Sequence, residues 1–464
     1  MTDIEGTIHR LWPVADEAIH DAVTAKLEGA ELLIADGHHR YETARSYMAE
    51  VGGDGNHCYT LMSLTGLDDA PVRILRIATG GDGVGALPDG RTVFVPRTAA
   101  GDLVTLRRVR LSKTFARAEV LDIVEPSPDR VEPACPHFGR EQCGGCQLQQ
   151  LSLPAQLAAK RVMVGEALRR IGKLEVEDPD IEPAELAWGY RNKVTLAVSD
   201  GARTIGFHRQ GRPGDIFDLE RCRIADPALM DLWAAVREHR ALLPENAEQL
   251  VLRRDRDGGL HLAVRVRGQT VWRSAALLHV ALVRRGVPAV LWWVPESGAP
   301  RAMAGAAEPY PATVFEQVHP AMGDRVRTWA LAQLGTVAGL KAWDLYAGVG
   351  ETTARLAAGG AGVESGELDP RAVVEAARRG PAEGVRRHAG RAEDVVPTLA
   401  PADVVVTNPP RTGMDARVIE AIVASRSKRI AYISCDPATL ARDLNRMLSR
   451  LPASPPPRLA ALRA

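Results

Sequence analysis

The chain contains the stretch Asp403-Val-Val-Val-Thr-Asn-Pro-Pro-Arg-Thr-Gly-Met414, and the stretch Tyr432-Ile-Ser-Cys-Asp-Pro437 follows it closely. Each stretch is a short apolar run that ends in a polar loop. That pattern is typical of a buried parallel strand that delivers polar residues to the carboxyl edge of a sheet. Upstream, Trp343-Asp-Leu-Tyr-Ala-Gly-Val-Gly350 is a third strand end with a glycine-rich turn. Three such loops on one sheet predict a nucleotide-type cofactor with a cysteine, Cys435, beside it.

Acidic residues extend this series of strand ends. The run Ala361–Asp369 predicts a strand that ends in Glu367, and Gly390–Asp394 predicts a further acidic strand end. An acid roughly twenty residues after a glycine turn suits a contact with ribose hydroxyls. The order of glycine turn, ribose acid, third acid and Asn-Pro-Pro loop favours an α/β, Rossmann-like S-adenosylmethionine methyltransferase domain. An unrelated nucleotide-binding α/β domain is the alternative.

Composition narrows the class of protein only slightly. The 464 residues include 58 Lys and Arg and 58 Asp and Glu, so any basic surface for a nucleic acid must be local. No run of about 18 apolar residues is present, which excludes an ordinary membrane-spanning helix. The first residues lack the basic and apolar regions of a signal peptide. We therefore expect a cytoplasmic protein.

Cysteine spacing predicts a metal centre. Cys135, Cys143 and Cys146 follow the pattern C-x7-C-x2-C, and a fourth thiol, Cys222, lies in Asp218-Leu-Glu-Arg-Cys-Arg223. In a reducing compartment such a group indicates metal binding rather than disulfides. Four thiolates suit a [4Fe–4S] cluster or a structural zinc ion, and spacing alone does not choose between them.

Residues 1–69 differ in character from the rest of the chain. The run Leu32-Leu-Ile-Ala-Asp-Gly-His-His-Arg-Tyr-Glu42 predicts a strand, a turn and a helix start. Its cluster of His38, His39 and Arg40 could hold a phosphate at the helix N-terminus, or could simply cap the helix. The string resembles the signature Ala-Asp-Gly-His-His-Arg-Tyr-Glu of an uncharacterised bacterial family. We interpret residues 1–69 as a fused fragment of that family.

Residues 70–126 predict a small antiparallel β-barrel of the OB-like kind, because short strands alternate with turns. The segment is locally basic, and basic barrels commonly bind single-stranded or looped RNA. A solvated strand face is the alternative. The segment also resembles a TRAM domain, an RNA-binding module, in its Gly-Gly-Asp-Gly-Val turn and Val-Phe-Val-Pro strand. The basic residues are Arg107, Arg108, Arg110, Lys113 and Arg117.

Residues 127–310 contain the cysteines and predict a central α+β domain. A helical pattern covers 156–171 within a region, 151–185, that is helical in character. Strand patterns follow over 188–198 and 205–209, where aromatic and basic residues interleave. Such a mixture can stack bases and hold phosphates, or can form the polar outer face of a strand pair.

From about residue 71 to its end, the chain resembles the bacterial RNA (uracil-5-)-methyltransferases that carry a TRAM domain and an iron–sulfur cluster. The resemblance implies a methyltransferase domain over 311–464, the cofactors S-adenosylmethionine and [4Fe–4S], and a monomer that acts on RNA, with rRNA preferred to tRNA. The motifs that carry it are the four cysteines, Gly189-Tyr-Arg-Asn-Lys193, Phe315-x-Gln317, Asp344–Gly350, Asn408-Pro-Pro-Arg411 and Ser434-Cys-Asp-Pro437.

The resemblance also implies roles for individual residues. Cys435 is the nucleophile whose thiolate adds to carbon 6 of uracil, so that carbon 5 can take a methyl group before a base removes its proton. Asn408 and Arg411 complete the catalytic set, and Arg411 is the nearest cation in sequence to favour the thiolate. The implied cofactor contacts are Gln317, Asp344, Tyr346, Gly348, Gly350, Glu367 and Asn408, and the implied metal ligands are Cys135, Cys143, Cys146 and Cys222.

Three departures from the family pattern are visible. Asn408 and His319 stand where the family usually has Asp and Asn. The family's general base is a Glu that follows a further strand, whereas this chain ends at 459–464, where that last strand pair is expected to begin. An RNA-binding pseudo-enzyme with impaired turnover is therefore one alternative to an active uridine methyltransferase. An amino-group methyltransferase is another, although Arg411 and Cys435 disfavour it.

Overall fold

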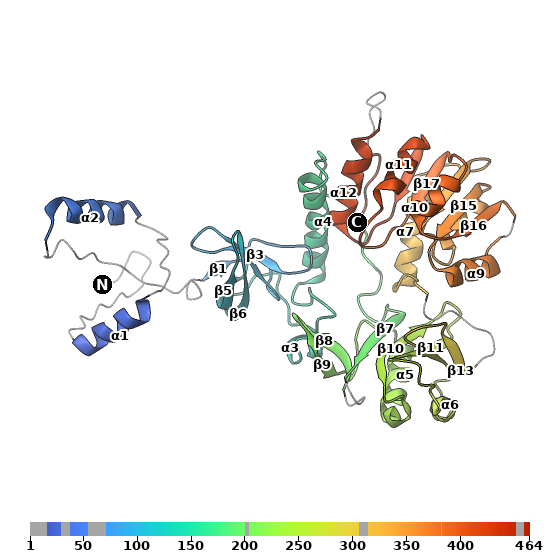
Figure 1. Cartoon of the computed structure of the whole chain (residues 1–464), viewed down its shortest axis with the longest axis horizontal. Coiled ribbons are helices and arrows are strands. Elements are labelled where there is room, and N and C mark those ends of the chain that lie inside the picture. The colour runs from blue at the N-terminus through green and yellow to red at the C-terminus, as the bar shows by residue number, and fades with distance from the viewer. Residues whose placement is uncertain are drawn as a thin grey trace. The chain divides into compact units, whose positions relative to one another are not determined.

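The computed structural model describes residues 16–28, 38–53, 71–199, 204–305, 314–381, 383–451 and 459–464 (Figure 1). The chain forms two compact units. The first comprises Met1–Leu75, Val84–Pro96 and Gly101–Pro126, and the second comprises Arg76–Gly83, Arg97–Ala100 and Ser127–Ala464.

The first unit begins with two helices, α1 (Glu17–Leu27) and α2 (His38–Val51). The predicted helix start at His38 is confirmed. The strand and turn predicted immediately before it lie outside the described residues, as do the side chains of the cluster at 38–40.

A sheet with strand order β1-β5-β6-β4-β3 completes the first unit. Alternate residues of its strands, among them Val93, Val104 and Ala116, are buried in one core. The run Gly80–Gly85 was expected to be all turn, but Val84 is buried and the strand β3 begins at Gly83. Closure of this sheet into a barrel stays a prediction. The strands are β1 (Val72–Arg73), β3 (Gly83–Ala86), β4 (Thr92–Val95), β5 (Leu103–Leu111) and β6 (Phe115–Glu125).

The second unit opens with a short strand, β2 (Arg76–Ile77), and the helices α3 (Pro136–Gly139) and α4 (Leu153–Arg170). The helical pattern expected over 151–185 was too long. Helix α4 ends at Arg170, because Gly172 and the left-handed Lys173, at φ 56°, cannot continue it.

A central sheet follows with the order β13-β12-β11-β10-β7-β8-β9. Only β11 and β12 pair in parallel among its neighbours, so the predicted α+β character is confirmed. Two helices, α5 (Pro227–Glu238) and α6 (Ala275–Arg284), bury Trp233 and Leu278 against it. The remaining elements are β7 (Lys193–Val198), β8 (Ile205–Arg209), β9 (Arg212–Asp218), η3 (Arg240–Leu242), β10 (Ala247–Arg254), β11 (Leu260–Val266), β12 (Ala289–Val294) and β13 (Arg301–Ala304).

The last part of the chain forms a five-stranded sheet in which every neighbouring pair is parallel, with the order β16-β15-β14-β17-β18. The strand order reverses between β14 and β17, and ligands of such sheets bind at that switch point. The strand ends that precede the glycine turn, the Asn-Pro-Pro-Arg loop and Cys435 therefore lie on neighbouring strands, as predicted. The strands are β14 (Lys341–Leu345), β15 (Gly362–Glu367), β16 (Val385–Ala389), β17 (Val404–Thr407) and β18 (Arg429–Tyr432).

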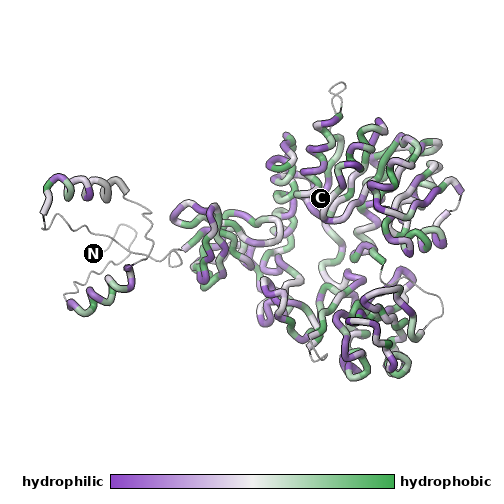
Figure 2. The backbone as a smooth tube through the Cα atoms, viewed as in Figure 1, coloured by the Kyte–Doolittle hydropathy of each residue, from purple (hydrophilic) through white to green (hydrophobic). Residues whose placement is uncertain are grey.

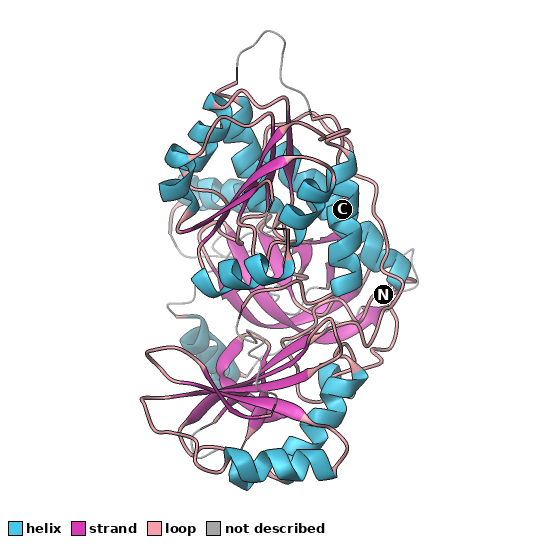
Figure 3. Ribbon diagram, turned by 90° about the vertical axis from the view of Figure 1, so that its right-hand side faces the viewer, coloured by secondary structure: helices cyan, strands magenta, loops and turns pink. Residues whose placement is uncertain are grey.

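Helices cover both faces of this sheet (Figure 3). Ala342, Val404 and Val406 pack on the side of α7 (Pro320–Ala332) and α8 (Glu351–Ala358). Trp343 and Val405 pack on the side of α11 (Ala416–Ala424) and α12 (Pro437–Leu448). Burial on both faces explains why the first three residues of β17 are all valine.

One expectation for this region was wrong in detail. The acidic strand end at Gly390–Asp394 is a turn and a helix, α10 (Ala392–Val395), because β16 has already ended at Ala389. The absence of the family's last strand stays a prediction, and Arg463 forms an isolated parallel bridge with Asp180. Helix α9 (Pro370–Arg379) and η4 (Val396–Thr398) complete the elements.

Hydrophilic residues interrupt the hydrophobic ones along the helices (Figure 2). Within the described residues, no helix has the length and apolar character needed to cross a membrane.

Candidate active site and cysteine pocket

The glycine turn after β14 is held by an acid from the neighbouring strand. Glu367, at the end of β15, accepts the N–H of Gly348 at 2.9 Å through Oε2 and the N–H of Asp369 at 2.8 Å through Oε1. The turn then passes into α8 through Gly350, whose φ of 79° and close approach to Ala376 leave no room for a Cβ. The predicted ribose acid and the predicted glycine turn are thus in direct contact.

Two further predicted cofactor residues lie beside this turn. Asp344 is 2% exposed, and the Thr353 hydroxyl donates to its Oδ2 at 2.6 Å, which fastens α8 to the sheet. Burial raises the pKa of Asp344 to about 7. Tyr346 adopts a left-handed φ of 61°, and burial raises the pKa of its hydroxyl.

The segment before α7 joins two of the predicted motifs. Gln317 is half-buried and lies next to Gly323 of α7. His319 accepts the N–H of Met322 at 3.4 Å and caps that helix, and its ring stacks on Tyr190 with centroids 4.6 Å apart. Burial lowers the pKa of His319. The histidine found in place of the family's usual Asn therefore has a structural use as a cap.

The two loops of the opening stretches lie side by side. Thr407 and Tyr432 pair at the ends of β17 and β18, and the N–H of Ile433 donates to the Thr407 carbonyl at 2.8 Å. On the other side, Asn408 donates its N–H to Leu345 of β14 at 3.2 Å. The Asn408 loop is therefore hydrogen-bonded on one side to β14, which precedes the glycine turn, and lies beside the end of β18, which precedes Cys435.

Within these loops, Cys435 and Arg411 are exposed to solvent. Asp436 is the acid nearest to Cys435 in sequence, but its Oδ1 accepts the N–H of Thr439 at 2.8 Å and caps α12. This carboxylate therefore has a structural partner in the helix that follows it.

Sequence reasoning missed Asp443, which lies on α12 and is fully buried. Its Oδ2 accepts the Tyr432 hydroxyl at 2.9 Å and the N–H of Met414 at 2.8 Å. The available signal was an acid within the apolar stripe Leu440, Leu444 and Met447, at helical spacing. A carboxylate at such a position is buried only when it has partners.

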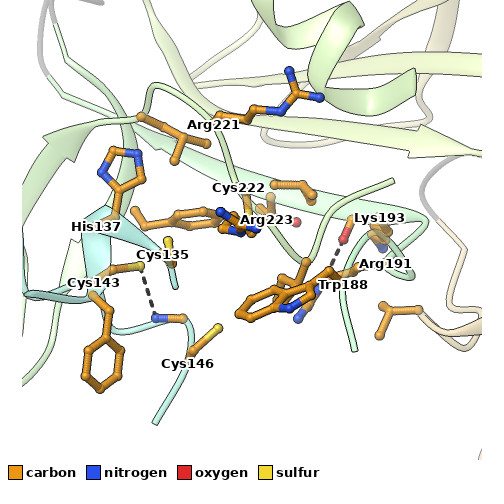
Figure 4. Close-up of a pocket in the computed structure, with 18 of the residues that line it drawn as sticks. Cys135, His137, Cys143, Cys146, Trp188, Arg191, Lys193, Arg221, Cys222 and Arg223 are labelled. Atoms are coloured by element: carbon orange, nitrogen blue, oxygen red, sulfur yellow. Dashed lines mark hydrogen bonds between the residues drawn. The ribbon is translucent and has the colours of Figure 1, made fainter. Parts of the chain in front are cut away.

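The four predicted metal ligands line one cavity of about 390 Å³ (Figure 4). Cys135, Cys143 and Cys146 come from the loop around α3, and Cys222 comes from the segment after β9. Burial raises the pKa of the Cys143 thiol to about 11 and also raises that of Cys146 and Cys222. Within the described parts of the chain, no three His, Cys, Asp or Glu side chains are arranged around the position of a single ion. The thiols surround a cavity rather than a point.

Aromatic and basic side chains form the rest of this cavity's lining. Trp188 and Phe315 are partly exposed, and the Arg223 guanidinium lies 5.3 Å from the centre of the Trp188 ring. The backbone of Asn192 also donates to Val318 at 2.9 Å. The cysteine cavity and the segment that contains Gln317 are therefore neighbours within the second unit.

Two protein-family models match parts of the chain. One, described as a protein of unknown function (DUF1015), matches residues 1–78. The other, described as tRNA (uracil-5-)-methyltransferase, matches residues 380–451, which include the Asn408 and Cys435 loops.

Longer matches come from curated proteins and solved structures. An uncharacterised RNA methyltransferase of Gloeobacter violaceus is 33% identical over 422 residues, covering 82% of this chain and 90% of that protein. One from Thermosynechococcus vestitus is 31% identical, with 82% and 91% covered. The crystal structure of Pyrococcus abyssi tRNA (uracil-54, C5)-methyltransferase with S-adenosyl-L-homocysteine has a TM-score of 0.58, is 22% identical, and covers 80% of this chain and 92% of its own. That structure shares the fold. On the length and identity of the curated matches, the chain belongs to the same family of RNA methyltransferases.

Proposed function

We propose that this protein transfers a methyl group from S-adenosylmethionine to carbon 5 of a uridine in RNA, with Cys435 as the covalent nucleophile. The observation that carries the proposal is the contact of three loops at one sheet edge. The Asn408 loop is bonded to β14, which leads into the glycine turn, and to β18, which leads to Cys435.

The glycine turn and its acid fit a nucleoside cofactor. Glu367 keeps a lone pair on each oxygen after accepting its two backbone bonds, so it can still accept ribose hydroxyls. We propose that Glu367 binds the ribose and that Gln317, Tyr346 and Asn408 complete the pocket. S-adenosylmethionine, when bound, supplies the electrophilic methyl group. Asp344 supports the site through Thr353.

The reaction needs a nucleophile because carbon 5 of uracil is itself weakly nucleophilic. The Cys435 thiolate adds to carbon 6, and the electron pair that this releases into the ring allows carbon 5 to bond to the methyl group. A base then takes the carbon-5 proton, the carbon 5–carbon 6 double bond reforms, and the thiolate leaves. Cys435 is exposed at the sheet edge. This exposure supports the role, because the uracil ring of the RNA must reach the thiol.

We also propose that the cysteine cavity holds a [4Fe–4S] cluster rather than zinc. A structural zinc ion needs four ligands about 2.3 Å from one point. Four thiols line a cavity of about 390 Å³, and thiolates are the ligands of iron–sulfur clusters.

RNA binding by the first unit is proposed from its basic strands β5 and β6, which is the role expected of a TRAM module. The family model and the solved structure both name tRNA in their descriptions, whereas the family resemblance led us to expect rRNA. Both RNAs therefore belong in the test.

The test uses RNA in which carbon 5 of each uridine carries fluorine. A fluorine cannot leave as a proton, so a cysteine adduct persists on a denaturing gel. The full chain, S-adenosylmethionine and fluorinated rRNA or tRNA transcripts should give a slow-migrating band. The band should vanish in Cys435→Ala and persist in Cys58→Ala, a matched cysteine variant from the N-terminal 69 residues.

Methyl transfer without an adduct in the wild-type protein, retained in Cys435→Ala, would contradict the covalent mechanism. RNA binding with neither adduct nor methyl transfer on either RNA would favour the pseudo-enzyme.

A further inference from the structure

Asp443 connects the two loops that carry the candidate catalytic residues. Its Oδ2 receives the hydroxyl of Tyr432, three residues before Cys435, at 2.9 Å. The same atom receives the backbone N–H of Met414, at the end of the Asn408 loop, at 2.8 Å. One buried oxygen atom is therefore shared between β18 and the loop that follows β17.

Arg442 completes this connection from the neighbouring position on α12. Its Nε and one terminal nitrogen bond Oδ1 of Asp443 at 2.9 and 2.8 Å, and the same terminal nitrogen donates to the Thr412 carbonyl at 2.7 Å. The Asn408 loop is thus bonded twice, through Thr412 to the guanidinium and through Met414 to the carboxylate.

The backbone of the loop is shaped for this contact. Gly413 has a φ of 79°, and a Cβ there would collide with both the Asp443 carboxylate and the Arg442 guanidinium. Glycine is therefore required at 413 by conformation and by space. The loop can lie against α12 only with this residue between Thr412 and Met414.

The energetics favour a rigid arrangement. Asp443 is 0% exposed and has four hydrogen bonds, and bonds to a buried charge are stronger than neutral ones. Removing the carboxylate would leave the Arg442 guanidinium and the Tyr432 hydroxyl without their acceptor. Both loops would then be free to move relative to each other.

We propose that Asp443 is a positioning residue that fixes the spacing between the Asn408 loop and the Cys435 loop. It does not touch the reacting atoms. It acts by holding Met414 and Tyr432 on the same atom, so that the nucleophile and the Asn-Pro-Pro-Arg turn keep one relative placement. The inference rests on the proposed function for its catalytic meaning, although the connection itself can be tested without activity.

The first experiment measures amide hydrogen exchange in the full chain. Asp443→Asn and Gly413→Ala should accelerate exchange of the Met414 amide about ten- to hundredfold, the loss expected for a hydrogen bond to a charged group. Exchange over 432–436 should rise in the same variants. The matched control is Asp403→Asn, because Asp403 accepts the N–H of Lys341 at 3.0 Å at the opposite end of β17. That variant should leave both loops unchanged.

The Gly413→Ala variant keeps every charge in place, so the test survives if Asp443→Asn does not fold. Unchanged exchange in both loops, or a change confined to α12, would overturn the proposal. So would acceleration in the Asn408 loop alone, because Asp443 would then not couple the two loops.

The second experiment separates positioning from folding by kinetics. For variants with a cooperative melt, single-turnover methyl transfer to in vitro rRNA and tRNA transcripts should slow about tenfold to a hundredfold, the range for small misplacement of reacting groups. In the same assay Tyr432→Phe, which removes one of the two bonds, should fall between Asp443→Asn and the wild type.

Full activity in Asp443→Asn beside an active wild type would overturn the inference and leave the proposed function intact. An inactive wild type that nevertheless shows the exchange result would support the connection and count against the proposed function.

Discussion

Asp344 is an acid whose environment favours its neutral form. It lies at the end of β14, is 2% exposed, and has the Thr353 hydroxyl as a donor at 2.6 Å. Burial raises its pKa to about 7, well above the ordinary value of about 4 for an aspartate. Between these two values the folded protein holds a proton that the unfolded chain has released. The contribution of this residue to the free energy of unfolding therefore falls as pH rises from about 4 to about 7. Above about pH 7 the destabilisation caused by the buried negative charge is complete.

Replacement by a neutral isostere should remove this pH dependence. Asp344→Asn should melt at about the same temperature from pH 5 to pH 8, whereas the wild-type melting temperature should decline across that range. A shift of this size corresponds to at most ~4 kcal/mol, so the two melting curves should differ most at pH 8. Calorimetry at fixed ionic strength measures the effect. Parallel curves for the two proteins would show that Asp344 is not protonated in the folded state.

At the residue scale, sequence reasoning predicted the strand-end loops but not the side chains that join them. Asn408 and Cys435 lie in loops at the ends of apolar runs, and Glu367 lies about twenty residues after the glycine turn, so local pattern and spacing were enough to select them. Asp443 is different, because its partners, Tyr432 and Met414, are brought to it only by the packing of α12. The role of His319 as a helix cap could not be predicted from local sequence either, because its ring is placed by stacking on Tyr190, which lies far away in the sequence.

At the scale of elements, the start of α8 is held from outside its own domain. Glu351, the first residue of that helix, pairs with Arg327 of α7 at 2.7 Å and with Arg256, which lies in the turn between β10 and β11 of the central sheet. Arg256 also pairs with Asp324 at 3.2 Å. Burial raises the pKa of Glu351, and the two arginines oppose that shift. The central sheet therefore reaches the helix that follows the glycine turn.

Loss of this arginine should weaken cofactor binding modestly. Arg256→Ala should raise the dissociation constant for S-adenosylmethionine a few-fold, about 1 kcal/mol or less, because the arginine is partly exposed and such pairs contribute little. Titration calorimetry of the full chain measures it. Arg267→Ala is the matched control, since Arg267 pairs with Glu248 at 2.8 Å on the exposed side of the same sheet. Equal affinities in all three proteins would show that α8 is positioned without Arg256.

Elements with a strong local pattern were predicted well. Strand β17 is β-branched and buried along its whole length, and α4 has a clear helical period. The errors occurred where conformation depends on single residues or on pairing. Helix α4 ends at Arg170, just before Gly172, and the acidic run after Gly390 becomes α10 because β16 pairs with β15 only as far as Ala389. The spacing of apolar residues indicates neither the end of α4 nor the end of β16.

For the whole molecule, the proposed cluster would be a structural link as well as a cofactor. It would join the loop containing Cys135 to the segment containing Cys222, which belong to distant parts of the sequence. Anaerobically purified protein should be brown, absorb at about 400 nm, where thiolate-to-iron charge transfer lies, and melt at a lower temperature once iron is chelated.

Two variants test whether the absorbance and the iron depend on the cysteine cavity. Cys222→Ala should lose the colour and the iron, whereas Cys435→Ala should keep both. One zinc ion per chain with no iron would contradict the assignment.

The parallel sheet of the last domain has a consequence for folding rather than for catalysis. Each of its strand pairs joins segments separated by at least one helix. Ala342 of β14, for example, pairs with Val404 of β17, which lies about sixty residues later in the chain. Contacts of such long range form slowly, because the chain must close large loops before pairing repays them. Until β17 arrives, β14 keeps a free edge beside an apolar face, a combination that invites aggregation. During synthesis, this interval is the one in which chaperones would have to protect the chain.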